Sequence, residues 1–392
     1  MNILFLIGKY PNHGGTEVVT TVLANAFAKK GYAVSIASFE QTVPELSTAL
    51  DKTIKLFALS YPVYSRRNIR DLKKIIFKED IDFVLNQWCL PLHVTKMCNA
   101  AIGKTKCKVI SVLHGIPDKN KRLVHLENKI KATDNSIVLM FYKLAHEVLL
   151  NVTAYNLRYV YRYSAKYVVL SESYIKSFIK LSKIKNASRL LTIGNPLTIS
   201  NEDYQYDPTS KEKVILYVGR MDHTNKRVDR IIEAWEKLYE VYPDWKLVLV
   251  GDGPDRATLE KYVKRKKILG VQFIGFKKDA PTAHYAKSSI LILTSDLEGF
   301  GLVLIEAMSY AVVPVVYGSY TAVYDIVTDN TSGFITNMPY SEEETVLKLK
   351  ELMSNPNKRN LMAEQALDKS KNFKLEMILN KWEILFSELN TQ

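Results

Sequence analysis

Residues 298–308 read EGFGLVLIEAM and combine two carboxylates, a glycine-flanked aromatic residue and an apolar stretch of helical length. Gly301 can lead directly into a helix, whose first turn presents free backbone N–H groups and the positive end of a dipole. Such a helix start binds phosphate. Glu298 would precede the helix and Glu306 would lie inside it. The run predicts a site that holds a diphosphate between two carboxylates, each of which accepts hydrogen bonds from hydroxyl groups. If the two glutamates are considered without the rest of the run, the alternative is a buried helix with two incidental acids.

Two fixed cations follow another apolar run. In VGRMDHTNKR, Arg220 comes directly after the run and Lys226 comes six residues later. Negative charge grows on a departing diphosphate, and fixed cations aimed at it stabilise that charge. Because the pair offers this stabilisation without a metal, we expect neither a metal site nor another cofactor. A surface Arg and Lys with no role is the alternative for the pair by itself.

Two further groups stand at the ends of apolar runs in the first half of the chain. Gly14 and Gly15, in NHGGTE, follow the first run, where a loop backbone without side chains can approach a diphosphate closely. His114 follows VISVL and could hydrogen-bond a sugar hydroxyl or serve only as a structural residue.

Short apolar runs alternate with longer helical patterns, which predicts parallel strands joined by crossover helices. In the first half the expected strands are Ile3–Ile7, Ala33–Ala37, Phe83–Leu85, Val109–Leu113, Ile137–Phe141, Tyr167–Leu170 and Leu190–Ile193. In the second half they are Val214–Gly219, Leu247–Gly253, Val271–Gly275, Ile290–Ser295 and Val312–Val316. A polar linker, Ser200 to Lys213, separates the two sets. We therefore expect two doubly wound α/β domains facing across a cleft, with ligands outside the carboxyl ends of the strands.

Composition and charge place the chain among soluble proteins with an anionic partner. The 392 residues carry 29 Lys and Arg against 13 Asp and Glu up to residue 200, and 25 against 28 afterwards. The basic first half should favour an anionic surface, although it could also only aid solubility. Three widely spaced cysteines match no metal pattern and favour a reducing cytosol. No uninterrupted apolar run reaches membrane-spanning length, and MNILFLIGKYP predicts a strand rather than a signal peptide.

A membrane surface is the anionic partner we expect. Residues 66–78, RRNIRDLKKIIFK, place their apolar side chains near one helical face and six cations elsewhere, as in a helix lying on an anionic membrane. Packing of this helix on its own domain is the alternative. The tyrosines of TAYNLRYVYRYSAKY also suit a membrane interface. They resemble a base-stacking surface as well, but we do not expect nucleic acid to bind.

Taken together, these motifs resemble the signature of retaining nucleotide-sugar glycosyltransferases of the GT-B fold, family four, over nearly the whole chain. The resemblance implies an acceptor-binding domain over residues 1–200 and a donor-binding domain over 201–373. The resemblance also allows a helix over 374–392 to cross back to the first domain. It implies catalytic roles for Glu298, His114, Arg220 and Lys226. It implies donor contacts from Gly14, Gly15, Arg220, Lys226, Phe276, Glu298, Phe300, Gly301, Leu302 and Glu306.

The expected activity is metal-independent hexosyl transfer from a nucleotide-diphosphate sugar, favouring a UDP-sugar. The acceptor would be a glycan or lipid-linked sugar in cell-surface polysaccharide biosynthesis, at the cytoplasmic face of the membrane. Family members usually have Lys followed by Gly where this chain has Lys226 and Arg227, which leaves the local turn open. Two other functions stay open: a nucleotide-sugar epimerase of the same fold, and a non-catalytic basic protein that binds a membrane or nucleic acid.

Overall fold

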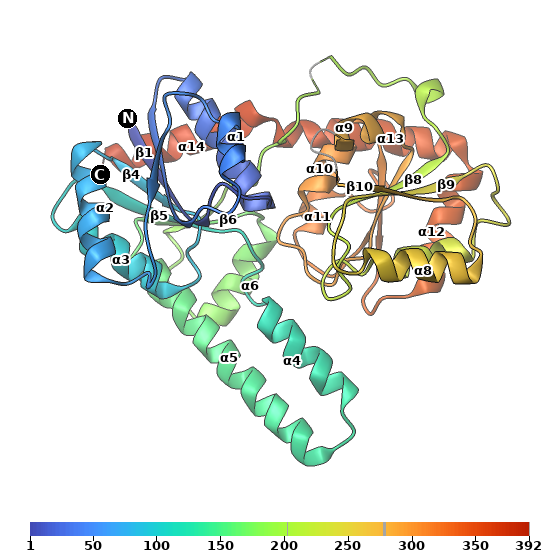
Figure 1. Ribbon diagram of the computed structural model, residues 1–392, viewed down its shortest axis with the longest axis horizontal. Helices are drawn as coiled ribbons and strands as arrows, with labels where there is room; N and C mark the ends of the chain where they lie inside the picture. Colours follow the sequence, from blue (N-terminus) through green and yellow to red (C-terminus); the bar gives the residue numbers. More distant parts are fainter. Residues whose placement is uncertain (202, 277–279, 392) are drawn as a thin grey trace. The chain divides into compact units, whose positions relative to one another are not determined.

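The computed structural model describes residues 1–201, 203–276 and 280–391 (Figure 1). They form two compact units: unit 1, residues 1–198 with 375–392, and unit 2, residues 199–374. Each unit contains one parallel β-sheet with helices packed on it (Figure 1). The expected pair of doubly wound α/β domains is therefore confirmed.

Unit 1 is built on a sheet with the strand order β3-β2-β1-β4-β5-β6-β7. The strands are β1 (Asn2–Lys9), β2 (Ala33–Glu40), β3 (Lys55–Ala58), β4 (Phe83–Asn86), β5 (Lys108–Leu113), β6 (Lys166–Val169) and β7 (Leu190–Thr192). The helices are α1 (Gly15–Lys29), α2 (Arg66–Lys78), α3 (Leu92–Ile102), α4 (Lys121–Ala132), α5 (Ser136–Arg162), α6 (Ser173–Ser182) and α14 (Leu375–Asn390), with a 3-10 turn at Pro44–Ala49. The strand order reverses between β1 and β4, so the carboxyl ends of these two strands flank the switch point where such sheets bind ligands.

Unit 2 is built on a sheet with the order β10-β9-β8-β11-β12-β13. The strands are β8 (Val214–Val218), β9 (Lys246–Val250), β10 (Val271–Gly275), β11 (Ile290–Leu293), β12 (Val313–Tyr317) and β13 (Phe334–Thr336). The helices are α7 (Val228–Glu236), α8 (Arg256–Lys266), α9 (Ala280–Lys287), α10 (Leu302–Met308), α11 (Val323–Ile326), α12 (Glu342–Ser354) and α13 (Pro356–Ser370), with 3-10 turns at Pro208–Ser210 and Lys371–Phe373. Here the switch point lies between β8 and β11.

The central strands are buried on both faces, as their continuous apolar runs predict. Residues 3–6 of β1 are fully buried, and so is Leu216 of β8. The last helix, α14, belongs to unit 1: its Phe386 ring lies 4.9 Å from the ring of Phe83 and 5.7 Å from that of Phe27. These aromatic contacts fix α14 in the core of unit 1.

Three sequence-based assignments need correction. The expected strand Ile137–Phe141 is wrong, because these residues lie in helix α5. The run is apolar and β-compatible in isolation, but apolar residues continue beyond it at helical spacing. The sequence also did not predict β3 and β13, since each has only three or four residues and stands at a sheet edge.

Helix α2 packs on its own unit, which was the alternative to a membrane-bound helix. Leu72, Ile75 and Ile76 are buried in a hydrophobic cluster of unit 1, and Ile69 packs partly buried against it. The apolar face that would have entered a membrane is therefore occupied by the core.

Helices α4 and α5 form a hairpin that projects from the rest of unit 1 (Figure 1). The side chains of Asn120 and Asn135 cap the two helix starts by accepting backbone N–H bonds. Only the later part of α5 is buried, through residues such as Thr153, Leu157 and Val160.

Candidate functional site

Lys226 and Glu298 meet at the carboxyl edge of the sheet in unit 2. Lys226 lies in the loop after β8 and Glu298 in the loop after β11, and these neighbouring strands flank the switch point. The Lys226 Nζ atom lies 2.5 Å from Glu298 Oε2, and the two side chains are 27% and 13% exposed. The structure thus brings together one predicted diphosphate cation and one predicted sugar-binding carboxylate.

Two more contacts hold these loops together. The backbone N–H of Asp296 donates to the carbonyl of Asn225 at 2.7 Å. Arg227 Nη1 lies 3.2 Å from Asp296 Oδ2. Within its own segment, Arg227 also places Nη2 2.8 Å from Asp229 Oδ2. Lys226 is therefore positioned by the residue that follows it.

Arg227 stands where the resembling family usually has glycine, and it adopts a glycine-like backbone. Its φ of 51° and ψ of 49° are left-handed, at the start of α7. That conformation costs a non-glycine residue roughly 1–2 kcal/mol. The ion pairs with Asp229 and Asp296 offset this cost, so the turn is kept despite the change of residue type.

Arg220 follows β8 directly but is more open than Lys226. Its side chain is 64% exposed, and its Nε lies 3.8 Å from Asp222 Oδ2. The buried Tyr217 hydroxyl donates to the Arg220 carbonyl at 2.8 Å. Burial, together with the nearby carboxylates of Glu298 and Asp222, raises the pKa of Tyr217, which keeps this hydroxyl protonated as a donor.

Gly301 begins α10 in the conformation that glycine favours. Its φ is +87°, and a Cβ atom there would lie 2.7 Å from the Tyr320 hydroxyl oxygen. No side chain caps α10, and Leu302 is its first residue. Phe300 is buried and packs edge-on against Phe373 with ring centroids 5.9 Å apart. The aromatic residue of the motif therefore has a packing role within unit 2.

Glu306 lies in α10 with only 9% of its surface exposed. The fully buried Tyr285, from α9, donates its hydroxyl to Glu306 Oε2 at 3.0 Å. This bond orients one of the two carboxylates that were predicted to accept hydrogen bonds from hydroxyls of the donor. The sequence reasoning did not find Tyr285, because the spacing between α9 and α10 carries no local signal for the contact.

The GDGP element after β9 has a packing explanation. A Cβ atom on Gly251 would lie 1.9 Å from the carbonyl oxygen of Gly219, and one on Gly253 would lie 2.2 Å from that of Met221. These glycines let the loop after β9 run against the loop that carries Arg220. Phe276, a predicted donor contact, follows β10 and is 59% exposed, and the next residue, Lys277, lies outside the described residues.

In unit 1, Gly14 precedes α1 and Gly15 begins it, after the short loop that follows β1. Gly14 is extended, and a Cβ atom there would lie 2.2 Å from a carboxylate oxygen of Glu17. Burial raises the pKa of Glu17, although its own backbone N–H and Lys9 act in the opposite direction. The chain's own carboxylate therefore lies against the glycine pair that was predicted to approach a diphosphate.

His114 lies at the carboxyl end of β5 and is hydrogen-bonded through Nε2 to Oε1 of Gln87, which follows β4. Burial lowers the pKa of His114 from 6.5 to about 4, so the imidazole is neutral at physiological pH. The amide oxygen can only accept, so Nε2 donates and Nδ1 is the unprotonated nitrogen. Gln87 is a site residue that the sequence reasoning missed, although its position after an apolar run was a usable signal.

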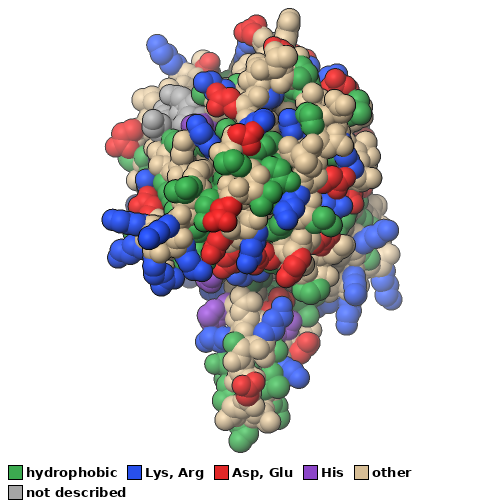
Figure 2. All heavy atoms as spheres, turned by 90° about the vertical axis from the view of Figure 1, so that its right-hand side faces the viewer, with side chains coloured by type: hydrophobic (Ala, Val, Ile, Leu, Met, Phe, Trp, Pro, Cys, Tyr) green, Lys and Arg blue, Asp and Glu red, His purple; other side chains and the backbone are tan. Residues whose placement is uncertain are grey.

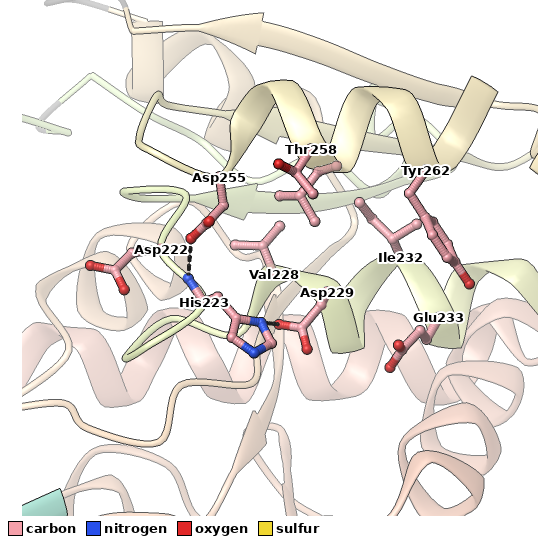
Figure 3. A pocket seen from close by; sticks show the side chains of 10 residues that line it. Asp222, His223, Val228, Asp229, Ile232, Glu233, Asp255, Thr258 and Tyr262 are labelled. Atoms are coloured by element: carbon pink, nitrogen blue, oxygen red, sulfur yellow. Dashed lines mark hydrogen bonds and ion pairs between the residues drawn. The ribbon is translucent and has the colours of Figure 1, made fainter. Parts of the chain in front are cut away.

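A pocket of about 250 Å³ lies between α7 and α8 (Figure 3). It is lined by the apolar side chains of Val228, Ile232 and Leu259 and by the carboxylates of Asp222, Asp229, Glu233 and Asp255. Figure 3 shows the His223 ring turned toward Asp229, with Nδ1 and Oδ1 3.2 Å apart. Carboxylates repel a diphosphate, so this pocket does not suit the anion predicted at Arg220 and Lys226. Among the described residues, no group of three or more His, Cys, Asp or Glu is placed to hold a metal ion.

Comparison with known proteins places both units in one family. The family model Glycosyltransferase Family 4 matches residues 13–198, and Glycosyl transferases group 1 matches residues 199–369. The chain is 24% identical over 391 residues to the amylovoran biosynthesis glycosyltransferase AmsD of Erwinia amylovora, covering 97% of this chain and 98% of that protein. It is 29% identical over 219 residues, 55% of this chain and 57% of the other, to an alpha-1,4-N-acetyl-D-galactosaminyltransferase of Campylobacter jejuni named for a PP-undecaprenol acceptor.

The fold has solved counterparts. The structure of Anabaena Alr3699/HepE in complex with UDP and glucose matches with a TM-score of 0.74, covering 99% of this chain and 100% of that chain at 16% identity. These comparisons favour neither the epimerase nor the non-catalytic alternative. The two family matches, together with the two doubly wound units, identify the chain as a glycosyltransferase of the GT-B fold, family four.

Proposed function

We propose that this glycosyltransferase moves a hexose from a UDP-sugar to a glycan or lipid-linked acceptor, retaining the anomeric configuration and using no metal. The observation that carries the proposal is the Lys226–Glu298 ion pair at the switch point of unit 2. Without donor, each charge neutralises the other. With donor, the ammonium would turn to the diphosphate and the carboxylate to a sugar hydroxyl.

The other donor contacts follow from the residues around this pair. Glu306, oriented by Tyr285, would accept hydrogen bonds from the ribose hydroxyls. Arg220 would add a second cation, and the backbone N–H groups of Gly301 and Leu302 would face the phosphate oxygens. The buried hydroxyl of Ser295, at the carboxyl end of β11, has no hydrogen-bond partner among the described residues. A buried unsatisfied hydroxyl three residues before Glu298 supports a site that a polar ligand completes.

The reaction would break the bond between the anomeric carbon and the diphosphate and form a bond from that carbon to an acceptor hydroxyl oxygen. The hydroxyl proton would pass to an oxygen of the leaving phosphate, on the same face of the sugar, as is discussed for retaining enzymes of this family. Lys226 and Arg220 would stabilise the charge on the leaving group. Glu298 and Glu306 address two parts of one donor in this scheme, so they are not the paired carboxylates of a glycosidase.

The roles of Gly14, Gly15 and His114 remain predictions from the sequence. His114 would act as a neutral hydrogen-bonding residue toward a sugar hydroxyl, because its lowered pKa excludes an imidazolium at neutral pH. Phe276, an exposed aromatic residue after β10, remains the proposed contact to the base.

The acceptor and donor classes rest on relatives. AmsD takes part in amylovoran biosynthesis, the Campylobacter enzyme is named for a PP-undecaprenol acceptor, and HepE was solved with UDP and glucose. We therefore propose a role in cell-surface polysaccharide biosynthesis at the cytoplasmic face of the membrane.

A donor screen tests the proposal. The purified full chain is mixed with UDP-, GDP- and ADP-sugars, and thermal shift identifies the donor. Mass spectrometry then follows release of the nucleoside diphosphate and formation of a glycosylated acceptor, with and without excess EDTA. We expect a UDP-sugar to stabilise the protein and turnover to persist in EDTA. Conversion of the sugar without nucleotide release would indicate an epimerase, and loss of turnover in EDTA that manganese restores would contradict the metal-free scheme.

A further inference from the structure

Helix α5 carries a continuous apolar stripe that the protein itself leaves uncovered. Side chains recurring every three or four residues are between 50% and 77% exposed: Ile137, Phe141, Leu144, Val148, Val152 and Tyr155. Met140 adds to this stripe near its start and is 69% exposed. Figure 2 shows hydrophobic side chains gathered at the far end of the projecting hairpin. Monomeric soluble proteins rarely expose such a contiguous apolar surface unless it binds something.

The opposite face of α5 is already occupied by α4. Lys129 of α4 places its Nζ 5.3 Å from the ring centroid of Tyr142, and His146 Nε2 lies 3.5 Å from Glu127 Oε1. The capped and paired helices therefore form a folded hairpin. Its exposed stripe is a second apolar face, and it is not needed to hold α4 in place.

Helix length and burial indicate insertion into the surface of a membrane, not passage through it. Within the described residues, α5 is the one helix long and apolar enough to cross a membrane by length and composition. Its later part, however, is buried in unit 1 and leads directly into β6. The exposed part, residues 137–152, is about 24 Å long, shorter than a hydrocarbon core of about 30 Å. Lys143 and Glu147 also interrupt it.

Charges around the stripe select an anionic surface. Residues 119–162 contain eight Lys or Arg and three Asp or Glu. Lys129 and Lys131 stand in the last turn of α4, beside the apolar tip of the hairpin. Near the base of the hairpin, the tilted ring of Tyr159 lies 6.4 Å from that of Tyr155 and 4.5 Å from that of Tyr163, measured between centroids. Lys96 Nζ lies 5.9 Å from the centroid of the Tyr159 ring. Apolar side chains flanked by cations and tyrosines match acyl chains below anionic headgroups.

We propose that the hairpin of residues 119–162 embeds its apolar tip in the interface of an anionic lipid bilayer. A second copy of the chain is a poorer occupant, because two hairpins with an excess of cations repel each other. A glycan is also a less suitable partner for the stripe, because aliphatic side chains form no hydrogen bonds with its hydroxyl groups. Asp134, in the turn at the tip, restricts the depth to the interfacial layer.

This docking would bring the carboxyl edge of the sheet in unit 1 to the membrane. The hairpin follows the carboxyl end of β5 a few residues after His114, and α5 leads back into the amino end of β6. Helix α5 is about 40 Å long, whereas β5 is about 20 Å long. The tip of the hairpin therefore extends beyond the carboxyl edge of the sheet. A lipid-linked acceptor could then reach that edge from the bilayer; this consequence rests on the proposed function, whereas the docking itself does not.

Vesicle binding tests the docking. The full chain is floated with vesicles of phosphatidylcholine alone or with phosphatidylglycerol, at low and high salt. We expect binding to the mixed vesicles that falls as salt rises. The variant Met140→Ser/Phe141→Ser/Leu144→Ser should lower the partition coefficient about tenfold or more. The matched control Leu347→Ser/Leu361→Ser, which removes exposed leucines of α12 and α13, should bind like the wild type.

Two further measurements distinguish a lipid bilayer from a second copy of the chain as the partner of the hairpin. A Phe141→Trp reporter should shift to shorter wavelength and be quenched by brominated lipid, whereas a Leu347→Trp control should not. Sedimentation without lipid should give the same mass for the wild type and the triple Ser variant; a dimer lost in the variant would overturn the proposal in favour of a second copy. Equal vesicle binding by the triple variant and wild type would also overturn it. UDP binding measured in parallel reports on the donor site, so failure of docking and failure of the proposed function are distinguishable.

Discussion

Arg227 and Asp296 join the loop after β8 to the loop after β11, with Nη1 and Oδ2 3.2 Å apart. Asp296 also lies 2.6 Å from Arg230 Nη1, so one carboxylate serves two guanidinium groups. The pair holds Arg227 in a left-handed conformation and thereby positions Lys226 beside Glu298.

The first prediction concerns the stabilising effect of that carboxylate. Asp296→Asn removes the carboxylate that two partly buried guanidinium groups share, and Arg227 keeps its second partner, Asp229. The change should lower the free energy of unfolding by about 1–3 kcal/mol, which is less than the cost at a fully buried pair. Urea unfolding measures the change. The control is Asp244→Asn, which breaks the exposed pair with Lys213 and should cost less than about 0.5 kcal/mol. Equal losses in the two variants would show that Asp296 has no special role.

The second prediction separates the two partners of the ion pair. Lys226→Met should weaken UDP binding about 10- to 150-fold, because a hydrogen-bonded charge opposite the diphosphate is lost. Glu298→Gln should instead tighten UDP binding up to about fivefold, since Lys226 no longer has a competing carboxylate. The same Glu298 variant should lose turnover of the intact UDP-sugar. Calorimetry with UDP and with the sugar donor measures both; weaker UDP binding in the Glu298 variant would refute the exchange of partners.

The third prediction concerns the buried contact between Tyr285 and Glu306. Glu306→Ala should weaken UDP and UDP-sugar binding alike, about 10- to 150-fold, because it removes the acceptor for ribose hydroxyls. Tyr285→Phe removes only the bond that orients the carboxylate and should weaken both ligands about 2- to 12-fold. A uridine-free ligand such as inorganic pyrophosphate should bind the Tyr285 variant and the wild type equally. A selective loss of the sugar-bearing donor in the Glu306 variant would move this carboxylate away from the ribose.

The fourth prediction uses the lowered pKa of His114. The unfolded chain binds a proton near pH 6.5 that the folded chain does not take up until about pH 4. Stability contributed by the neutral imidazole is therefore present above pH 6.5 and is lost as the pH falls toward 4. When the pH falls from about 7.5 to about 5, the free energy of unfolding should decrease less in the His114→Asn variant than in the wild type. His125→Asn, at an exposed position of the same unit, should follow the wild type; if the His114 variant does so too, the imidazole is not held neutral.

Several features of the fold followed from local sequence patterns. The alternation of apolar runs and helical patterns predicted most strands within one or two residues, because a strand buried on both faces needs a continuous apolar run. Helix α14 was expected over residues 374–392 and spans Leu375–Asn390. The run Ile137–Phe141 failed because a short apolar run fits a strand and a helix equally well.

Apolar periodicity and turn chemistry are local properties, so the two doubly wound units and the residue types that end their strands could be predicted from the sequence. Which of those strand ends meet depends on the order of the strands in each sheet, which is a property of the folded chain. Lys226 and Glu298 are 72 residues apart and touch because β8 lies next to β11, a neighbourhood set by strand order and not by spacing. The same holds for His114 with Gln87 and for Tyr285 with Glu306. The exposed apolar stripe of α5 could also be identified only from the folded structure. The sequence shows that a residue is apolar, but whether other residues cover it depends on their positions in the fold.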